Sequence, residues 1–339
     1  SDARGTLFAV GRLLRSLRMR KGHVELDSSL NIVSAPAYPI RGHQLGYRPK
    51  SNTYDAWDLA RFEQYIRDLV VFGTNSIELI PPLAPDDESA RSPLMPVDPW
   101  EMIRVLPDLL DSYDLNVWIW VPVEDTDIGD STVRKRNLEQ RDRLFRMCKR
   151  LDAIFIPGGD PGNTPPELLM PYLRDLAAVL RESHPKAQVW VSNQGFSFEW
   201  LETVYTYLRE ERPDWLTGVV YGPWTKQTLA QVRASVPERY PIRDYPDICH
   251  TVRCQYPVPQ WDKGFALTLN REPINPRPIQ YAHIHNVTAQ YTVGGITYSD
   301  GVNDDVNKIV WSARSWDPKV EVRDVLTEYG RYFIGEDFA

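Results

Sequence analysis

The sequence lacks the features that usually place a chain in a membrane or on a nucleic acid. No apolar run approaches the roughly 20 residues that a membrane-spanning helix needs, and the first residues do not match a signal peptide. The net charge of −7 comes from mixed signs, with no basic block and no low-complexity segment. We therefore expect neither a nucleic acid nor a membrane as a partner.

Cysteine is also scarce. Three cysteines, Cys148, Cys249 and Cys254, are too few for a disulfide framework. The segment from Cys249 and His250 to Cys254 has no second half of the kind that completes a zinc site. We expect buried thiols or one local disulfide, no metal and no cofactor. The compartment stays open, with a secreted or periplasmic location slightly favoured over a cytoplasmic one, and the oligomeric state stays open as well.

Several catalytic motifs are missing. The chain has no GxxxxGK or GxGxxG phosphate-binding loop and no GxSxG nucleophile turn. Cys249 and His250 are sequence neighbours, so their side chains cannot face each other in a strand. What the chain has instead is 11 Trp, 17 Tyr and 28 Pro, a composition that favours a loop-rich protein with aromatic faces.

Short β-type runs alternate with amphipathic segments along the chain. The expected strands are Ile40–Tyr47, Ser76–Ile80, Asn116–Val123, Ala153–Ile156, Gln188–Ser192, Thr217–Tyr221, Tyr240–Arg243 and Thr292–Tyr298. Helical spacing occurs in Ala56–Phe72, Pro99–Ser112, Val133–Arg150, Pro166–Ser183, Glu199–Glu211 and Thr228–Val236. The alternation predicts an α/β fold, a closed (β/α)₈ TIM-type barrel; an open doubly wound sheet has the same local pattern. The long Pro-rich connection Asp244–Gln290 is expected to be an irregular functional loop.

The strand ends carry polar and aromatic residues, although the strand bodies are apolar. The run AIFIPGGDPG shows this best, because a buried strand ends in two glycines that present Asp160. Asp160 could instead cap the following helix. The other strands exit into GYR, VPVED, SNQGF, VVYGPW, RDYPD and TYSDGVNDDVNK. Since barrel enzymes place their chemistry at the carboxyl ends of the strands, these residues predict one site.

Acids mixed with amides, Tyr and Trp suit a neutral, polyhydroxylated ligand. Carboxylates and amides hydrogen-bond hydroxyl groups, and indole faces cover the apolar side of a sugar ring. Cleavage of a glycosidic bond needs two carboxyl groups, one a general acid and the other a nucleophile or base. The sequence therefore predicts a carbohydrate-active protein.

The residues also carry a family resemblance. RGTLFAVGRLLRSL and NIVSAPAYPIRGHQLGYR resemble the end of the small α/β domain and the first barrel strand of β-N-acetylhexosaminidases and α-glucuronidases. The resemblance implies that Arg41 contacts sugar hydroxyls. PGGDPG is similar to the Gly-Gly-Asp-Glu run of hexosaminidases, with Asp160 matching the Asp and Pro161 standing where the Glu would be. VVYGPW looks like a strand-six segment of α-glucuronidases, and Asp247 lies where those enzymes carry a second acid.

The resemblance also implies a domain division. Residues 1–37 would be the last helix and strand of the accessory domain, packed on a barrel formed by 38–339. An ordinary N-terminal helical extension is the alternative.

We predict a glycoside hydrolase in which Asp160 is the general acid or orients the reacting group. For the second carboxylate, Glu124 and Asp300 rank ahead of Asp304, with Asp247 last. Expected substrate-binding residues are Arg41, His43, Tyr47, Glu78, Trp120, Asn193, Gln194, Tyr221, Asp247, Tyr298 and Asn303; Trp120 could instead belong to the core. The alternative is a non-catalytic sugar-binding barrel, which Pro161 favours. A sugar isomerase or lyase would need clustered metal ligands, for which only His43 and His250 are available.

Overall fold

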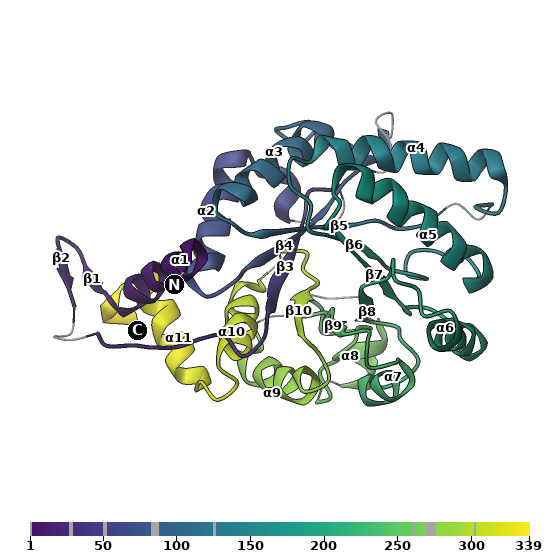
Figure 1. Ribbon diagram of the computed structural model, residues 1–339. Coiled ribbons are helices and arrows are strands. Elements are labelled where there is room, and N and C mark those ends of the chain that lie inside the picture. Colours follow the sequence, from purple (N-terminus) through teal and green to yellow (C-terminus); the bar gives the residue numbers. More distant parts are fainter. Residues whose placement is uncertain are drawn as a thin grey trace.

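The computed structural model describes residues 2–26, 30–49, 53–82, 88–124, 127–260, 262–268, 276–301 and 303–339. Eight parallel strands form a closed barrel in the order β10-β3-β4-β5-β6-β7-β8-β9 (Figure 1). The strands are β3 (Ile40–Gly46), β4 (Ser76–Ile80), β5 (Asn116–Trp120), β6 (Ala153–Ile156), β7 (Gln188–Ser192), β8 (Gly218–Tyr221), β9 (Ile242–Asp244) and β10 (Gly294–Thr297). The predicted (β/α)₈ barrel is thus confirmed, and the open sheet is wrong.

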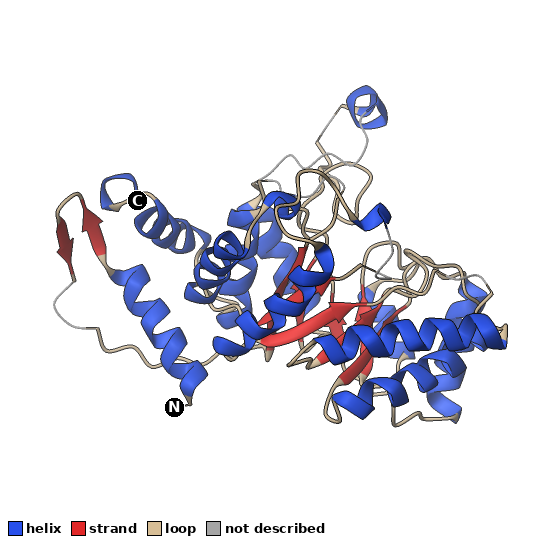
Figure 2. Ribbon diagram, turned by 90° about the horizontal axis from the view of Figure 1, so that it is seen from above, coloured by secondary structure: helices blue, strands red, loops and turns tan. Residues whose placement is uncertain are grey.

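Helices cover the outside of the barrel, as Figure 2 shows from above. In chain order, the helices from residue 59 onward are α2 (Leu59–Val71), α3 (Pro99–Ser112), α4 (Ser131–Met147), α5 (Pro166–Ser183), α6 (Phe198–Glu210), α7 (Leu229–Ser235), the short α8 (Lys263–Thr268), α9 (Pro278–Ala289), α10 (Asp305–Trp316) and α11 (Val322–Phe333), and 3₁₀ turns occur at Thr53–Ala56, Glu88–Ala90 and Glu336–Phe338. Side-chain caps accept backbone N–H groups at the starts of five of them, from Asp58, Asp98, Asp130, Ser197 and Thr228. These caps satisfy donors that the first helical turn leaves unpaired, which fixes where each helix begins.

The structure corrects the predicted elements at their edges and in one loop. β5 ends at Trp120 rather than Val123, because the chain that follows contains Pro122, which has no N–H to donate to a neighbouring strand. The connection Asp244–Gln290 is not irregular throughout, because it contains α8 and α9. Helix α9 lacks the one-sided apolar pattern that marked the other helices, so it carries no periodic signal by which it could be predicted.

Strand parity separates two apolar layers. The outer layer lies between strands and helices and takes alternate strand residues such as Ile77, Val117 and Ile154. The inner layer fills the barrel and consists of Trp118, Ala153, Phe155, Trp190, Val220, Tyr245 and Ile296. Large aromatic side chains therefore fill the barrel axis, as expected for a closed eight-stranded barrel whose interior is a packed core.

A polar network crosses this aromatic interior. Arg243 of β9 donates to Glu78 of β4 at 2.7 Å, and both side chains are fully buried. Gln44 Nε2 donates to the same carboxylate at 2.8 Å, and Gln44 Oε1 accepts from the Tyr245 hydroxyl at 3.0 Å. The Arg243 guanidinium lies 4.7 Å from the ring centroids of both Trp118 and Phe155. Ring faces thus cover the part of the cation that Glu78 does not reach.

The N-terminal segment packs beside the barrel. Helix α1 (Ala3–Ser16) contacts α2 and α11, and β1 (Arg18–Arg20) pairs with β2 (His23–Glu25) in an antiparallel hairpin. A side chain at Gly11 would lie 2.8 Å from the Val71 carbonyl oxygen, so α1 approaches α2 closely. The hairpin projects to one side of the barrel in both views. The origin of this segment as an accessory-domain remnant stays a prediction.

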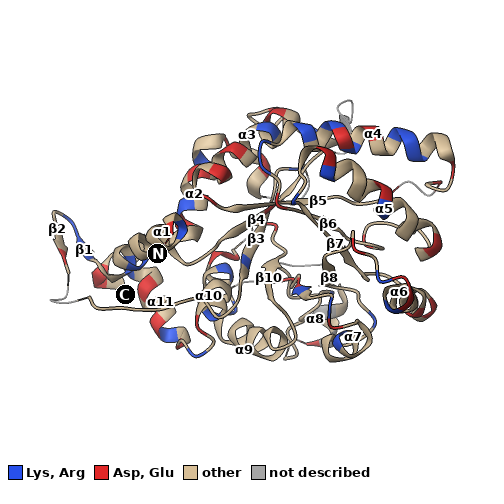
Figure 3. Ribbon diagram, in the orientation of Figure 1, with Lys and Arg blue, Asp and Glu red and all other residues tan. Residues whose placement is uncertain are grey.

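Charged residues of both signs are interspersed over the outer helices (Figure 3). Many form ion pairs one turn apart, such as Arg104 with Glu101 and Arg146 with Asp142. In the described part of the chain, no helix combines the length and apolarity needed to cross a bilayer.

The buried ion pair gives a stability prediction. Replacing Glu78 by Ala leaves the Arg243 charge buried without its carboxylate, so the free energy of unfolding should fall by about 3–5 kcal/mol. Urea unfolding followed by circular dichroism measures this. As a control, Glu101→Ala removes an exposed partner of Arg104 and should cost less than about 1 kcal/mol. Equal losses in the two variants would contradict a special role for the barrel-centre pair.

Candidate functional site

Asp160 is presented by a loop that lies directly against its neighbour. The Gly159 N–H donates to the Gln194 carbonyl at 2.9 Å. A side chain at Gly159 would lie 2.6 Å from that same oxygen, and Gly158 adopts a left-handed conformation with φ of 73°. The two glycines are therefore required by close backbone approach. Asp160 is exposed, and it does not cap α5, whose N-cap is Pro165 without a side-chain hydrogen bond.

Glu124 comes from the adjoining loop. Val121 N–H donates to the Phe155 carbonyl at 2.8 Å, and a side chain at Gly162 would lie 2.9 Å from the Val123 carbonyl. The loops after β5 and β6 are thus in contact. Glu124 is exposed. Asp160 and Glu124, the candidate catalytic acids on this side of the barrel, therefore lie on loops that contact each other, and both are exposed to solvent.

Trp120 and two amides flank these acids. Trp120 is half-buried and packs on the apolar interior of the barrel, so it combines the two roles considered for it. Asn193 and Gln194 follow β7 and are buried. Within the described residues, Asn193 Oδ1 and Gln194 Oε1 have no hydrogen-bond partner. Buried acceptors are nearly always paired in folded proteins, so these two oxygens mark a place for hydrogen-bond donors from outside the chain.

The opposite side of the rim holds a tighter cluster. An isolated bridge pairs Asp247 with Tyr298, extending β9 and β10 beyond their regular ends. His250 lies between two acids: its Nδ1 is 3.1 Å from Asp247 Oδ1, and its Nε2 is 3.2 Å from Asp300 Oδ2. Tyr298 Oη donates to Asp300 Oδ1 at 2.7 Å, and Arg48 lies 3.6 Å from the same oxygen.

Cys249 belongs to the same cluster. Its thiol, one His250 ring nitrogen and one Asp300 oxygen all lie within 4.8 Å of one another, and the three residues are buried. Burial and the nearby carboxylates of Asp304 and Asp300 raise the pKa of the Cys249 thiol, whereas a hydrogen bond from the Asp300 backbone acts in the opposite direction. All three cysteines lie in the described residues and none forms a disulfide, and Cys148 and Cys249 are buried, so of the two expected alternatives buried thiols are found and a local disulfide is not.

Three expected binding residues lie away from the rim. Arg41 is at the start of β3, at the opposite end of the barrel, where its guanidinium lies between Phe8 and Trp316 and donates to the Gly73 carbonyl at 2.8 Å. His43 faces α10, with its ring nitrogens 2.8 Å from Thr297 Oγ1 and 2.9 Å from Ser312 Oγ.

Tyr47 is the third. It faces the helices, and its hydroxyl donates to the Val97 carbonyl at 2.7 Å. The expectation that these three side chains line the site at the rim was wrong, because the odd-numbered residues of β3, and Tyr47 directly after its carboxyl end, point away from the barrel axis.

Four other residues that were expected at the site have different surroundings: two are in buried ion pairs, one packs on the outer apolar layer and one is exposed. Glu78 is sealed in the barrel-centre network described above. Asp304 forms a fully buried ion pair with Lys308 and accepts from Ser299 Oγ at 2.6 Å, so its carboxylate is not open at the rim. Tyr221 packs on the outer apolar layer, and burial raises its pKa to about 12. Asn303 is exposed with φ of 55°.

Sequence reasoning did not include Arg48, Cys249, His250 or Tyr245 among the site residues. The first three contact or adjoin Asp300, and Tyr245 closes the network below the rim. The signal that could have found His250 is its position three residues after Asp247 in the loop that follows the seventh barrel strand.

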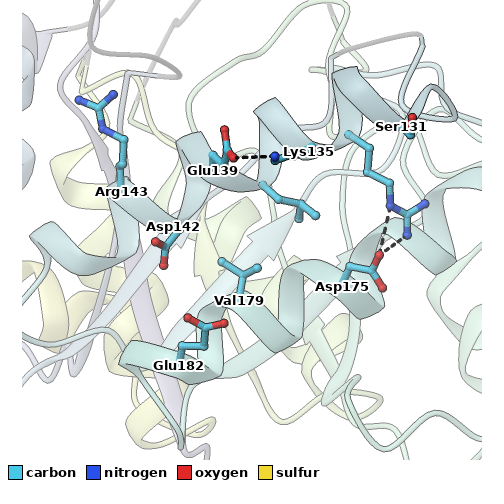
Figure 4. Close-up of a pocket in the computed structure, with 10 residues that line it drawn as sticks. Ser131, Lys135, Glu139, Asp142, Arg143, Asp175, Val179 and Glu182 are labelled. Carbon is cyan, nitrogen blue, oxygen red and sulfur yellow. Dashed lines mark hydrogen bonds and ion pairs between the residues drawn. The ribbon is translucent and has the colours of Figure 1, made fainter.

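A separate groove lies on the outer helical layer between α4 and α5, with Lys135 beside Glu139 and Arg134 paired to Asp175 (Figure 4). The charged side chains that line it are of both signs and are exposed or half-exposed. None of the expected site residues lines this groove.

Comparison with known family models finds no match, and comparison with curated proteins finds no relative. Solved structures with the same barrel include glycosidases. An O-GlcNAc hydrolase of Thermobaculum terrenum is 12% identical with a TM-score of 0.57, and the match covers 88% of this chain and 64% of that one. A β-N-acetylhexosaminidase of Bacteroides fragilis is 12% identical with a TM-score of 0.57, covering 92% and 72%. An endo-β-1,4-mannanase of Thermotoga petrophila is 9% identical with a TM-score of 0.54, covering 86% and 79%.

These likenesses establish the fold as a parallel barrel of the kind found in glycoside hydrolases. The chain spans less than two thirds of the length of the Thermobaculum structure. At such identities the likeness does not extend to individual residues or to activity.

Asp244 gives a prediction for pH dependence. It is the last residue of β9, is buried in the outer layer, and has its pKa raised from 3.8 to about 7, chiefly by burial. The folded state therefore keeps this proton up to about pH 7, whereas the unfolded chain releases it near pH 4. The contribution of Asp244 to stability should fall as the pH rises through this interval.

In Asp244→Asn this dependence disappears. The variant should be more stable than the wild type above pH 7, by up to about 4 kcal/mol, since each pKa unit corresponds to about 1.36 kcal/mol. Urea unfolding at pH 5, 6, 7 and 8 measures the difference, with the exposed Asp324→Asn as the control. A difference that stays constant over this range would rule out Asp244 as the titrating group.

Proposed function

We propose that the protein is a glycoside hydrolase, with Asp160 and Glu124 as its pair of carboxyl groups. The observation that carries this proposal is the contact between the loops after β5 and β6, which brings two exposed acids to neighbouring positions on the carboxyl rim. Glycosidases use two carboxyl groups on opposite sides of the scissile bond. Asp160 serves as general acid, and Glu124 serves as nucleophile or as base toward water.

Asp300 is the less suitable second carboxylate. In the closed order of strands, β10 is four positions from β6, on the far side of the barrel. The carboxylate oxygens of Asp300 already contact Tyr298, Arg48 and His250. We assign Asp300 to the organisation of the opposite wall of the site, together with Asp247 and Tyr298.

A neutral sugar is the proposed ligand. Asn193 and Gln194 supply buried oxygens that can accept hydrogen bonds from sugar hydroxyls, and the half-buried indole of Trp120 offers an apolar face for a pyranose ring. The glycosidase names of the structural neighbours agree with this class of ligand, and they support the proposal through the fold. We expect the substrate to be a glycoside, and we leave its sugar to the experiment.

Replacing Asp160 by Asn tests the proposed chemistry. Turnover of a nitrophenyl glycoside, selected from a panel as the best wild-type substrate, should fall by about 10²–10⁴-fold because proton transfer is lost. Glu124→Gln should cause a loss of similar size. Asp142→Asn, an acid on the outer surface of α4, is the control and should retain wild-type turnover, and circular dichroism confirms that each variant folds.

Two outcomes would contradict the proposal. Near-wild-type turnover of Asp160→Asn would remove it from the reaction. A wild-type protein that binds sugars but hydrolyses none of the panel would instead be the non-catalytic barrel, the alternative that Pro161 favours because it replaces an acid of the resembled motif.

The amide pair gives a separate prediction about binding. Gln194→Ala removes a buried acceptor and should raise KM several-fold to about tenfold, corresponding to one net hydrogen bond of about 0.5–1.5 kcal/mol. The matched control is Gln290→Ala, because Gln290 is exposed just beyond α9 and its amide donates to the nearby Val287 carbonyl at 2.9 Å. An unchanged KM for Gln194→Ala would place the sugar elsewhere.

A further inference from the structure

The cluster after β9 contains three side chains that are unusual neighbours in a carbohydrate site. The Cys249 thiol, the His250 imidazole and the Asp300 carboxylate converge from two separate strand ends, with their ligand atoms within 4.8 Å of one another. Thiolate, imidazole and carboxylate are the three side-chain groups that bind Zn²⁺.

The orientation of His250 shows which nitrogen faces the convergence point. Nδ1 lies 3.1 Å from both oxygens of Asp247, so Nδ1 carries a proton and donates it. Nε2 lies 3.2 Å from Asp300 Oδ2. A neutral ring with this tautomer turns a lone pair toward a carboxylate oxygen, which is repulsive unless a cation lies between them. That cation is either a proton on Nε2 or a metal ion.

The spacing of Nε2 and Oδ2 fits either cation, and the third ligand atom nearby, together with the surrounding contacts, favours the metal. Two ligands bound tetrahedrally to Zn²⁺ at about 2.0–2.3 Å are about 3.3–3.6 Å apart, close to the separation of Nε2 and Oδ2. A proton on Nε2 bridges two atoms only, whereas a metal ion can also bind the Cys249 sulfur, which lies within 4.8 Å of both.

Hydrogen bonds from other residues also orient the candidate ligands, as they do in metal sites. Asp247 accepts from His250 Nδ1 and from the backbone N–H groups of Cys249 and His250, each at 3.1 Å. Tyr298 donates to the other oxygen of Asp300 at 2.7 Å. Metal-binding histidines usually donate their second nitrogen to a carboxylate, and metal-binding carboxylates are themselves hydrogen-bonded.

We propose that Cys249, His250 and Asp300 form a Zn²⁺ site at the carboxyl rim, with Asp247 as the residue that positions His250. Oxygen-preferring cations such as Mg²⁺ and Ca²⁺ do not suit a thiolate and an imidazole. Three protein ligands leave the fourth tetrahedral position for water or for an oxygen of a bound molecule. Binding releases the thiol proton of Cys249. The site is independent of the proposed carboxyl pair, which lies across the barrel.

Metal content tests the proposal directly. The full chain, produced in zinc-supplemented medium and desalted, should contain one zinc per molecule by plasma mass spectrometry. Cys249→Ala and His250→Ala should lose this zinc, whereas Cys148→Ala, which removes an equally buried thiol at the end of α4, should keep it. Asp247→Asn should weaken zinc affinity by about 10- to 100-fold in competition with a chromophoric chelator.

Cobalt gives a second readout that does not depend on activity. Protein stripped with a chelator and reloaded with Co²⁺ should show a thiolate-to-cobalt charge-transfer band that Cys249→Ala lacks. Wild-type protein without bound zinc and without this band would overturn the proposal and leave His250 as an imidazolium between two carboxylates. Asp160→Asn should keep its full zinc content, so a failure of the catalytic proposal is distinguishable from a failure of this one.

Discussion

The ion pair between Arg243 and Glu78 is the constraint around which the barrel is organised. It joins β9 to β4 across the axis, and the rings of Trp118 and Phe155 cover the rest of the guanidinium. Charges in a packed interior are tolerated only when they are paired, so the two strands must hold these side chains inward. Because strand residues alternate, the same requirement turns Asp244 outward and Tyr245 inward. Tyr245 then reaches Gln44 and completes the polar layer beneath the rim.

The barrel and the general position of its rim could be predicted because they depend on local patterns. Apolar runs of four to eight residues alternated with helical spacing, and the strand ends were marked by proline, glycine and acids. Asp160 illustrates this success, since the glycines before it are required by the close approach of its loop to Gln194. Here local sequence and tertiary contact point to the same conformation.

The first barrel strand shows why the facing of individual residues was harder to predict. In IRGHQLGY, polar and apolar residues occur on both faces, so the alternation that normally reveals the buried side is absent. The direction of each side chain is visible only when Gln44 pairs with Glu78 inside the barrel and His43 pairs with Ser312 outside it. Arg41 was placed at the rim by resemblance alone, and its burial between Phe8 and Trp316 gives it a structural role at the other end of the barrel.

The cluster of Asp247, His250 and Asp300 depends on contacts that sequence order conceals. His250 and Asp300 are 50 residues apart. They meet because the bridge between Asp247 and Tyr298 continues the pairing of β9 and β10 past their regular ends. The sequence offered Cys249, His250 and Cys254 in one loop and His43 in another strand, whereas the third ligand atom in space belongs to Asp300. A pattern confined to one loop could not supply it.

The two sides of the rim differ in exposure, and this difference bears on what each can do. Asp160 and Glu124 are open to solvent, so they can exchange protons with water during a reaction. On the other side, the buried His250 ring lies 3.1 Å from Asp247 and 3.2 Å from Asp300, which are also buried. A change in the charge of any one of these side chains would leave a neighbouring charge uncompensated, in a place where water cannot screen it. In the proposed reaction, proton transfer would therefore fall to the side formed by β5 and β6, and fixed positioning of charge to the side formed by β9 and β10. A ligand above Trp120 and Tyr298, which both pack on the aromatic interior, would contact both sides.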